Sequence, residues 1–137
     1  MTTAGYSGTP LPNKLGIKPD SRFCVVHAPD GFDSTLGVLP AGAIWVDALE
    51  AGLDVAIGFY TAQADLIDDW QSLTDAVAPA GTVWVCWPKR ASKLPTDITE
   101  DVLRQLLLPT GWVDNKVCAV DATWSGLRFA LRRELRE

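Results

Sequence analysis

The sequence predicts an α/β fold with a mostly parallel sheet of about six strands. Residues 53–61 are apolar almost throughout, which is typical of a strand that is buried on both faces. This strand leads into residues 62–78, where large apolar side chains recur at helical spacing. A turn at 79–81 then separates the helix from a second strand at 82–87. These segments form one β-α-β unit, which joins two parallel strands by a helical crossover.

The other elements follow from shorter patterns along the chain. We expect strands at 22–27, 43–46, 112–120 and 127–133, a short helix at about 32–37, and a helix that opens with a capping box at 97–100. The link between the last two strands, 121–126, is too short for a crossover helix, so these strands pair antiparallel as a hairpin. The alternation of strands and helices predicts a layered fold that ends in this hairpin.

Length and composition indicate one domain with a substantial core. The chain has 137 residues, of which 47% are hydrophobic and six are Trp, and this composition suits a packed globule. Residues 1–20 are rich in Gly and Pro, so we expect an extended lead-in with one helical turn at 13–15 that Asn13 caps. A single α/β domain is expected to fill residues 21–137.

The sequence contains no pattern for a membrane span, a secretory signal or a metal site. No apolar run approaches the roughly 20 residues that a span needs, and the N-terminal residues lack a basic stretch followed by an apolar one. Cys24, Cys86 and Cys118 lie far apart, each inside an expected strand, without metal-ligand spacing. We therefore expect three reduced core thiols, no metal and a cytoplasmic location.

The net charge of −5 conceals an asymmetry. No Lys or Arg occurs between Arg22 and Lys89, whereas cations return at 89–93 and again at 128–136. The acidic total argues against general nucleic-acid binding, which needs a broad cationic surface. A small anionic ligand at the basic edge, or a protein partner, remains compatible with this pattern.

The predicted topology indicates where a ligand would bind. In an open parallel sheet, ligands bind beyond the carboxyl ends of the strands, near the point where the strand order reverses. The ligand-binding candidates placed there are His27, Asp30, Asp47, Thr61, Trp87, Lys89, Arg90 and Lys93.

Two groups of these candidates have alternative interpretations. His27, the only histidine, suits a general base oriented by Asp30 or Asp47, but a strand-end histidine that bonds a loop is the simpler interpretation. Trp87 and the cations of residues 89–93 suit a flat, anionic ligand, or else an indole packed under a solvated loop. No residue is predicted to be catalytic.

The hairpin link supplies a separate set of candidates. Trp124, Ser125 and Arg128 combine an aromatic ring, a hydroxyl and a cation at the expected turn. We consider them for partner contacts, including strand pairing at an exposed sheet edge. The alternative is a turn whose Trp simply covers the edge of the sheet.

The order of elements resembles that of class I S-adenosylmethionine-dependent methyltransferases. Residues 53–87 are similar to the family's central strand, helix and next strand. Trp124-Ser125-Gly126-Leu127-Arg128-Phe129 lies where that family turns into its final antiparallel strand. The resemblance covers most of residues 22–133 and implies a three-layer, Rossmann-like architecture.

The first turn departs from the methyltransferase pattern. A cofactor-binding turn needs several glycines, but residues 27–32 contain only Gly31, and Pro29 supplies no N–H. Asp47 does match the place of the acidic residue that holds a ribose in the resembling family. S-adenosylmethionine therefore stays an alternative, and the prediction is that the chain uses no cofactor.

The whole chain also resembles a family of small bacterial proteins to which no activity is assigned. The shared features are Tyr6-Ser7-Gly8-Thr9-Pro10-Leu11, Lys14-Leu15-Gly16-Ile17-Lys18, Trp87-Pro88-Lys89, and Cys118-Ala119-Val120-Asp121 followed by Trp124-Ser125-Gly126-Leu127-Arg128. This resemblance spans nearly the full length, but it implies no biochemical activity.

From the sequence we predict a non-catalytic ligand- or partner-binding module on a truncated methyltransferase-like fold. Whether the chain is an enzyme stays open, with the balance toward no activity. The first alternative is a minimal S-adenosylmethionine-dependent methyltransferase that uses Asp47. The second is a homodimeric interaction protein, and the sequence does not decide between a monomer and a homodimer.

Overall fold

The centre of the sheet is strand β3 (Val55–Phe59), which is buried at every position, as its unbroken apolar sequence requires. It pairs in parallel with β1 (Arg22–Val26) and with β4 (Thr82–Pro88). Strand β1 in turn pairs in parallel with the short strand β2 (Ile44–Trp45). The computed structural model describes residues 9–136, and these four strands form the parallel part of its sheet.

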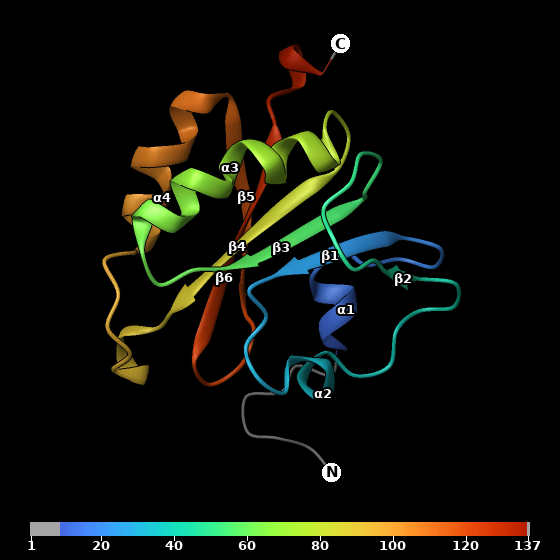
Figure 1. The fold of residues 1–137 in the computed structure, drawn as a ribbon, viewed down its shortest axis with the longest axis horizontal. Coiled ribbons are helices and arrows are strands. Elements are labelled where there is room, and N and C mark those ends of the chain that lie inside the picture. Colours follow the sequence, from blue (N-terminus) through green and yellow to red (C-terminus); the bar gives the residue numbers. More distant parts are fainter. Residues whose placement is uncertain (1–8, 137) are drawn as a thin grey trace.

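The chain ends in an antiparallel hairpin that extends this sheet. Strand β6 (Trp124–Leu131) lies between β4 and β5 (Trp112–Ala119) and is antiparallel to both. The complete order is β2-β1-β3-β4-β6-β5 (Figure 1). The predicted α/β fold, with six strands and a closing hairpin, is confirmed.

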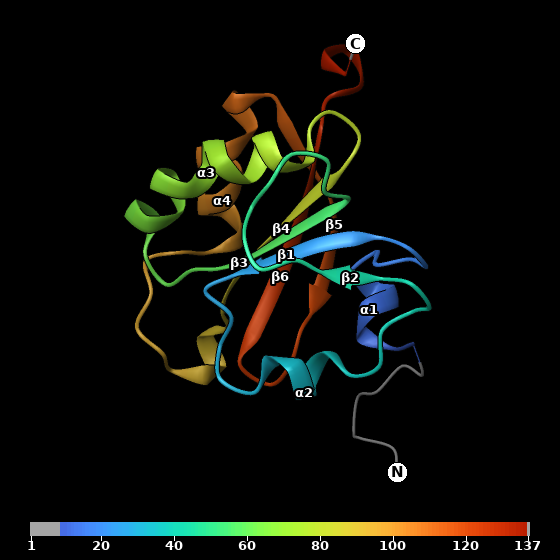
Figure 2. The same cartoon turned by 45° about the vertical axis from the view of Figure 1, so that its right-hand side comes forward.

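Helices cover both faces of the sheet and make it the middle of three layers (Figure 2). One face carries α3 (Gln63–Val77) and α4 (Glu100–Leu107), and the other carries α1 (Leu11–Lys14) and α2 (Phe32–Leu36). None of the helices within residues 9–136 has the length and apolar character needed to cross a membrane.

Alternation along β3 divides the core into two clusters. Val55, Ile57 and Phe59 pack toward α1 and α2, whereas Ala56 and the following Tyr60 pack toward α3 and α4. This arrangement follows from the period of two in a strand, which sends successive side chains to opposite faces. The unbroken apolar run is therefore needed to fill both clusters.

The segment before β1 is more structured than the sequence indicated. The helical turn predicted at 13–15 is wrong in its position and its cap, because α1 begins at Leu11, after Pro10. Pro12 lies in its first turn, where no backbone N–H donor is needed and the fixed φ of proline suits a helix. Leu15 and Ile17 are buried in the cluster beneath α1 and α2. The indole Nε1 of Trp84 donates a hydrogen bond to the Leu15 carbonyl at 2.8 Å.

The cap predicted for α4 also differs. Thr99, not Asp97, is its N-cap, and the Thr99 hydroxyl accepts a hydrogen bond from the Val102 N–H at 3.2 Å. The Asp97 carboxylate instead accepts from the N–H of Gln63, the first residue of α3, at 2.8 Å. Asp97, which was expected to cap α4, therefore caps α3.

Candidate functional site

The carboxyl ends of the parallel strands meet at one edge of the sheet, here called the carboxyl edge. It comprises residues 27–31 after β1, Asp47 after β2, residues 60–61 after β3 and residues 89–93 after β4. The strand order reverses between β1 and β3, because the chain continues from β1 outward to β2 and from β3 in the opposite direction to β4. This is the position at which open α/β sheets bind ligands.

A three-residue polar cluster lies across the reversal point. His27 follows β1, Tyr60 follows β3, and Asp69 reaches them from α3. The Asp69 carboxylate lies 3.1 Å from Nε2 of His27 and accepts a hydrogen bond from the Tyr60 hydroxyl at 2.8 Å. The His27 and Tyr60 rings meet edge to face, with centroids 5.4 Å apart. We call this group the His27–Asp69–Tyr60 cluster.

The cluster has a defined pattern of proton donors. Burial raises the pKa of Tyr60, and the hydrogen bond and charge of Asp69 raise it further, so the phenol stays protonated and donates. A carboxylate only accepts hydrogen bonds, so Nε2 of His27 donates to Asp69 as well. In the neutral ring this leaves Nδ1 as an acceptor, on a side chain that is 57% exposed. His27 is thus held in the tautomer that suits a proton acceptor.

Sequence reasoning missed the partner of His27. Asp30 and Asp47 were the expected partners, but both carboxylates are exposed and neither bonds His27. Asp69 belongs to the run of carboxylates on α3 that resembles an ordinary solvated helix face. The available signal was Tyr60, a hydroxyl at the end of a buried strand, which needs an acceptor nearby.

The parts of the carboxyl edge that follow β1 and β2 are accessible to a ligand at Gly31 and Asp47. Asp47 makes no hydrogen bond or ion pair with any residue that the structure describes. Gly31 adopts φ +79°, and a Cβ built on it would meet nothing within 4 Å. The backbone at Gly31 is therefore open to a ligand, as a glycine in a binding turn should be.

Thr61 contributes its backbone rather than its side chain. Its carbonyl accepts a hydrogen bond from the Thr96 hydroxyl at 2.7 Å and one from the Asp97 N–H at 3.3 Å. These bonds tie the end of β3 to the segment before α4. The Thr61 side chain makes no hydrogen bond within residues 9–136, so it stays a candidate by position alone.

The basic loop after β4 does not form the site expected from its sequence. Trp87 is buried in the core beneath α3 and α4, so its ring is not presented to a ligand. The Lys89 ammonium donates to the Asp121 carbonyl at 2.7 Å. Arg90 and Lys93 are exposed and make no ion pair within the described part of the chain. For Trp87 the structure matches the alternative interpretation, an indole packed under a solvated loop, and ligand binding by Lys89, Arg90 and Lys93 stays a prediction.

The residues expected at an exposed edge lie on an internal strand. Trp124, Ser125 and Arg128 belong to β6, which pairs with β4 on one side and β5 on the other. Trp124 packs edge to face on Phe59, with ring centroids 5.1 Å apart. The edge prediction is wrong because β6 turns back into the sheet, which leaves β5 as the outer strand.

A cavity of about 900 Å³ adjoins the carboxyl edge on the side of α1 and α2. It lies between those helices and the turn that joins β5 to β6, and Lys14, Lys89 and Asp121 are its charged lining residues. Its size is within the range of pockets that enclose small molecules.

Solved structures with a similar fold include two that are described as S-adenosylmethionine-dependent methyltransferases. A structure of DhpI in complex with SAH (S-adenosylhomocysteine) matches 90% of this chain and 83% of its own, with 13% identity and a TM-score of 0.57. An S-adenosylmethionine (SAM) dependent methyltransferase from Aquifex aeolicus matches 85% of each chain, with 12% identity and a TM-score of 0.56. A TehB-like SAM-dependent methyltransferase from Corynebacterium glutamicum matches 94% of this chain and 91% of its own, with 9% identity and a TM-score of 0.57.

This chain has a class I methyltransferase-like fold. No protein-family model matches the sequence, and no curated protein matches it either. At these identities the likeness establishes the fold of the chain.

The methyltransferase-like fold contradicts two predictions from the sequence. The prediction of a non-catalytic binding module is wrong, because the matching structures favour the alternative, a minimal methyltransferase. The prediction of no cofactor is wrong for the same reason, since DhpI was solved in complexes with SAH and with SAM. A first turn with a single glycine is therefore compatible with this fold, which the order of the whole sheet defines.

The residues of the carboxyl edge fit an adenosyl cofactor. Asp47 offers a free carboxylate to a ribose, and Gly31 leaves room for a ligand to approach the backbone. Pro29 removes one N–H from the turn, so the fit depends on Asp47 and Gly31 instead of a glycine-rich loop.

Proposed function

We propose that this chain is a minimal methyltransferase that uses S-adenosylmethionine at its carboxyl edge. The observation that carries the proposal is the reversal of strand order between β1 and β3, with Asp47 after β2. That carboxylate makes no hydrogen bond or ion pair within residues 9–136. The complexes of DhpI with SAH and SAM support the proposal, because they share this sheet across most of the chain.

The chain's own residues have separable tasks in this proposal. Asp47 accepts hydrogen bonds from the ribose hydroxyls, and Gly31 lets the backbone lie against the ligand. When bound, SAM supplies an electrophilic methyl group. The methyl acceptor binds on the α3 side of the same edge, beside the His27–Asp69–Tyr60 cluster.

His27 is the proton acceptor in this proposal. Its Nε2 is engaged by Asp69, which leaves Nδ1 to take a proton from the methyl acceptor. This role suits an acceptor whose nucleophile is an O–H or N–H group. Asp69 is a positioning residue, because it holds the imidazole and receives the Tyr60 hydrogen bond.

Calorimetric titration of the purified chain with SAH and SAM tests the proposal. We expect saturable binding of both, weakened about tenfold or more in Asp47→Ala, the loss expected when a charged acceptor is removed. Asp68→Ala is the matched control, because Asp68 is an exposed carboxylate on α3 that makes no bond with any described residue. Failure of the wild-type chain to bind either compound rejects the proposal, as does an equal loss in Asp68→Ala.

A further inference from the structure

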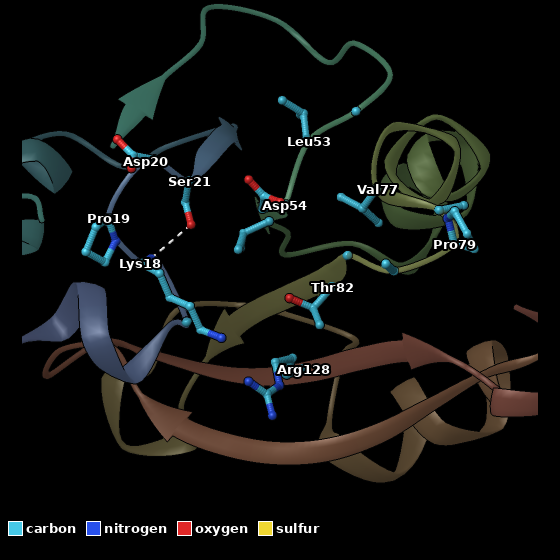
Figure 3. Close-up of a pocket in the computed structure, with 16 residues that line it drawn as sticks. Lys18, Pro19, Asp20, Ser21, Leu53, Asp54, Val77, Pro79, Thr82 and Arg128 are labelled. Carbon is cyan, nitrogen blue, oxygen red and sulfur yellow. Dashed lines mark hydrogen bonds between the residues drawn. The ribbon is translucent and has the colours of Figure 1, made fainter. Parts of the chain in front are cut away.

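A second cavity opens at the opposite edge of the sheet, where β1, β3 and β4 begin (Figure 3). It has a volume of about 650 Å³ and is lined by residues 16, 18–21, 52–55 and 77–82, together with Arg128. We call it the amino-edge cavity. It lies across the sheet from the carboxyl edge, so the proposed methyltransferase site does not explain it.

Two cations line this cavity without an ion-pair partner among residues 9–136: Lys18 and Arg128. The Arg128 guanidinium is fixed in place, because its Nε donates to Asn115 at 2.8 Å and its carbon lies 5.9 Å from the centre of the Trp84 ring. Its terminal nitrogens stay available, and Nη1 lies toward Gly16. A Cβ at Gly16 would lie 3.7 Å from Nη1, in ordinary contact, and glycine is favoured there by its φ of +80°.

Two carboxylates, Asp20 and Asp54, also belong to the lining. An oxygen of Asp54 accepts the N–H of Arg22 at 2.9 Å. The Asp20 carboxylate lies so close to Gly42 that a Cβ there would overlap it. In Figure 3 both carboxylates point away from the space in which Lys18, Thr82 and Arg128 gather. Neither carboxylate forms an ion pair with Lys18 or Arg128 among the described residues.

Hydroxyl donors lie beside the cations. Ser21 Oγ accepts the Lys18 N–H at 3.0 Å, which leaves its own proton free to donate. The Thr82 side chain faces the same space (Figure 3). An ammonium, a guanidinium and two hydroxyls present many donors to one region, and the oxygens of a phosphate group match such a set.

The size of the cavity indicates more than an inorganic ion. A volume of about 650 Å³ is typical of sites for small organic ligands. Leu53, Val77 and Pro79 supply an apolar wall opposite the cations. We propose that the amino-edge cavity binds a phosphorylated small molecule, with the phosphate at Lys18 and Arg128 and the organic part against this wall.

Amide NMR titration of the ¹⁵N-labelled full chain tests the proposal, with inorganic phosphate as the minimal probe. We expect saturable shifts at residues 16–21 and at Thr82. The Trp84 indole N–H should shift as well, because it donates to the carbonyl of Leu15, the residue before Gly16. Ribose 5-phosphate should bind more tightly than phosphate, and ribose should cause no shift. A preference for citrate over both phosphates would assign the site to carboxylates and overturn the proposal.

Two variants and one control locate the binding. Lys18→Gln should weaken phosphate binding about tenfold, and Thr82→Val should weaken it less, because a charged donor contributes more than a hydroxyl. Lys93→Gln is the control, since it removes from the carboxyl edge an exposed cation that forms no ion pair with any described residue. Equal loss in Lys93→Gln, or shifts centred on residues 89–93, would overturn the proposal, as would the absence of saturable shifts. Binding of SAH should be unchanged in Lys18→Gln, so this proposal and the methyltransferase proposal can fail separately.

Discussion

The hydroxyl of Tyr60 is a buried donor whose acceptor is Asp69. Burial and the neighbouring carboxylate both disfavour the phenolate, and for this reason its pKa is raised above the ordinary 10.0. Such a group links stability to pH, because the folded and unfolded chains then bind the proton with different affinity.

We expect the free energy of unfolding to fall above pH 10 in a manner that depends on Tyr60. The unfolded chain loses the phenolic proton near its ordinary pKa of 10.0, while the folded chain keeps it, so rising pH favours unfolding. The slope for this one group is about 1.4 kcal/mol per pH unit. Urea unfolding of the wild type and of Tyr60→Phe between about pH 8 and 11 measures it.

The Tyr60→Phe variant also supplies the control. Every other group that titrates in this range is present in both proteins, so its contribution cancels in the difference. If the free energy of unfolding falls equally with pH in the two proteins above pH 10, the pKa of Tyr60 is the same in the folded and unfolded chains, contrary to this account.

Among the elements, α3 depends on a residue that lies outside it. Its N-cap, Ala62, has no side-chain acceptor, and the Asp97 carboxylate supplies one from the segment before α4. The Gln63 side chain returns a hydrogen bond to the Asp97 carbonyl at 2.7 Å. The start of α3, and with it the helix that carries Asp69, is therefore anchored to the α4 side.

We expect Asp97→Ala to lower the free energy of unfolding by about 1 kcal/mol, the usual cost of a lost cap. Asp97→Asn should lose less, because its amide oxygen still accepts the Gln63 N–H. Urea unfolding measures the loss, and hydrogen exchange should locate it in the first turn of α3. Faster exchange in the first turn of α4 instead would contradict the cap assignment, since Thr99 caps that helix.

At the scale of the whole molecule, the segment before β1 is part of the core. Leu15 is fully buried beneath the sheet, and its carbonyl accepts the Trp84 indole N–H. Leu15 therefore completes one of the two apolar clusters of the core. Its segment is rich in Gly and Pro, and for that reason the sequence predicted only an extended lead-in.

We expect Leu15→Ala to lower the free energy of unfolding by about 2–5 kcal/mol, as for other buried leucines. Leu135→Ala is the control, because half of that side chain is exposed, and its loss should stay within about 0.5 kcal/mol. Denaturant unfolding of both variants makes the comparison. Equal, small losses would show that the segment packs only loosely on the sheet.

These comparisons show why the fold was predictable and the site was not. Strand β3 is apolar on both faces and α3 has a clear apolar stripe, so local patterns were enough to place the sheet and its hairpin. The partner of His27 depends on how α3 lies across the sheet, 42 residues further along the chain. The burial of the Trp87 ring likewise depends on which face of β4 it occupies. The sequence does not show that face, because a strand buried on both faces has no alternation of polar and apolar residues.

The position of β6 has a consequence for how the protein is made. Strand β4 ends at Pro88, but its neighbour β6 begins only at Trp124, so the ribosome must add the 35 residues 89–123 before that strand starts. At about 5–20 residues per second, this takes roughly 2–7 s. During that interval the nascent chain presents the apolar strand β4 as an open edge, which is the kind of surface that pairs with other chains. A ribosome that stalls between β4 and β6 would prolong this state, and chaperone protection during synthesis matters most for this stretch of the chain.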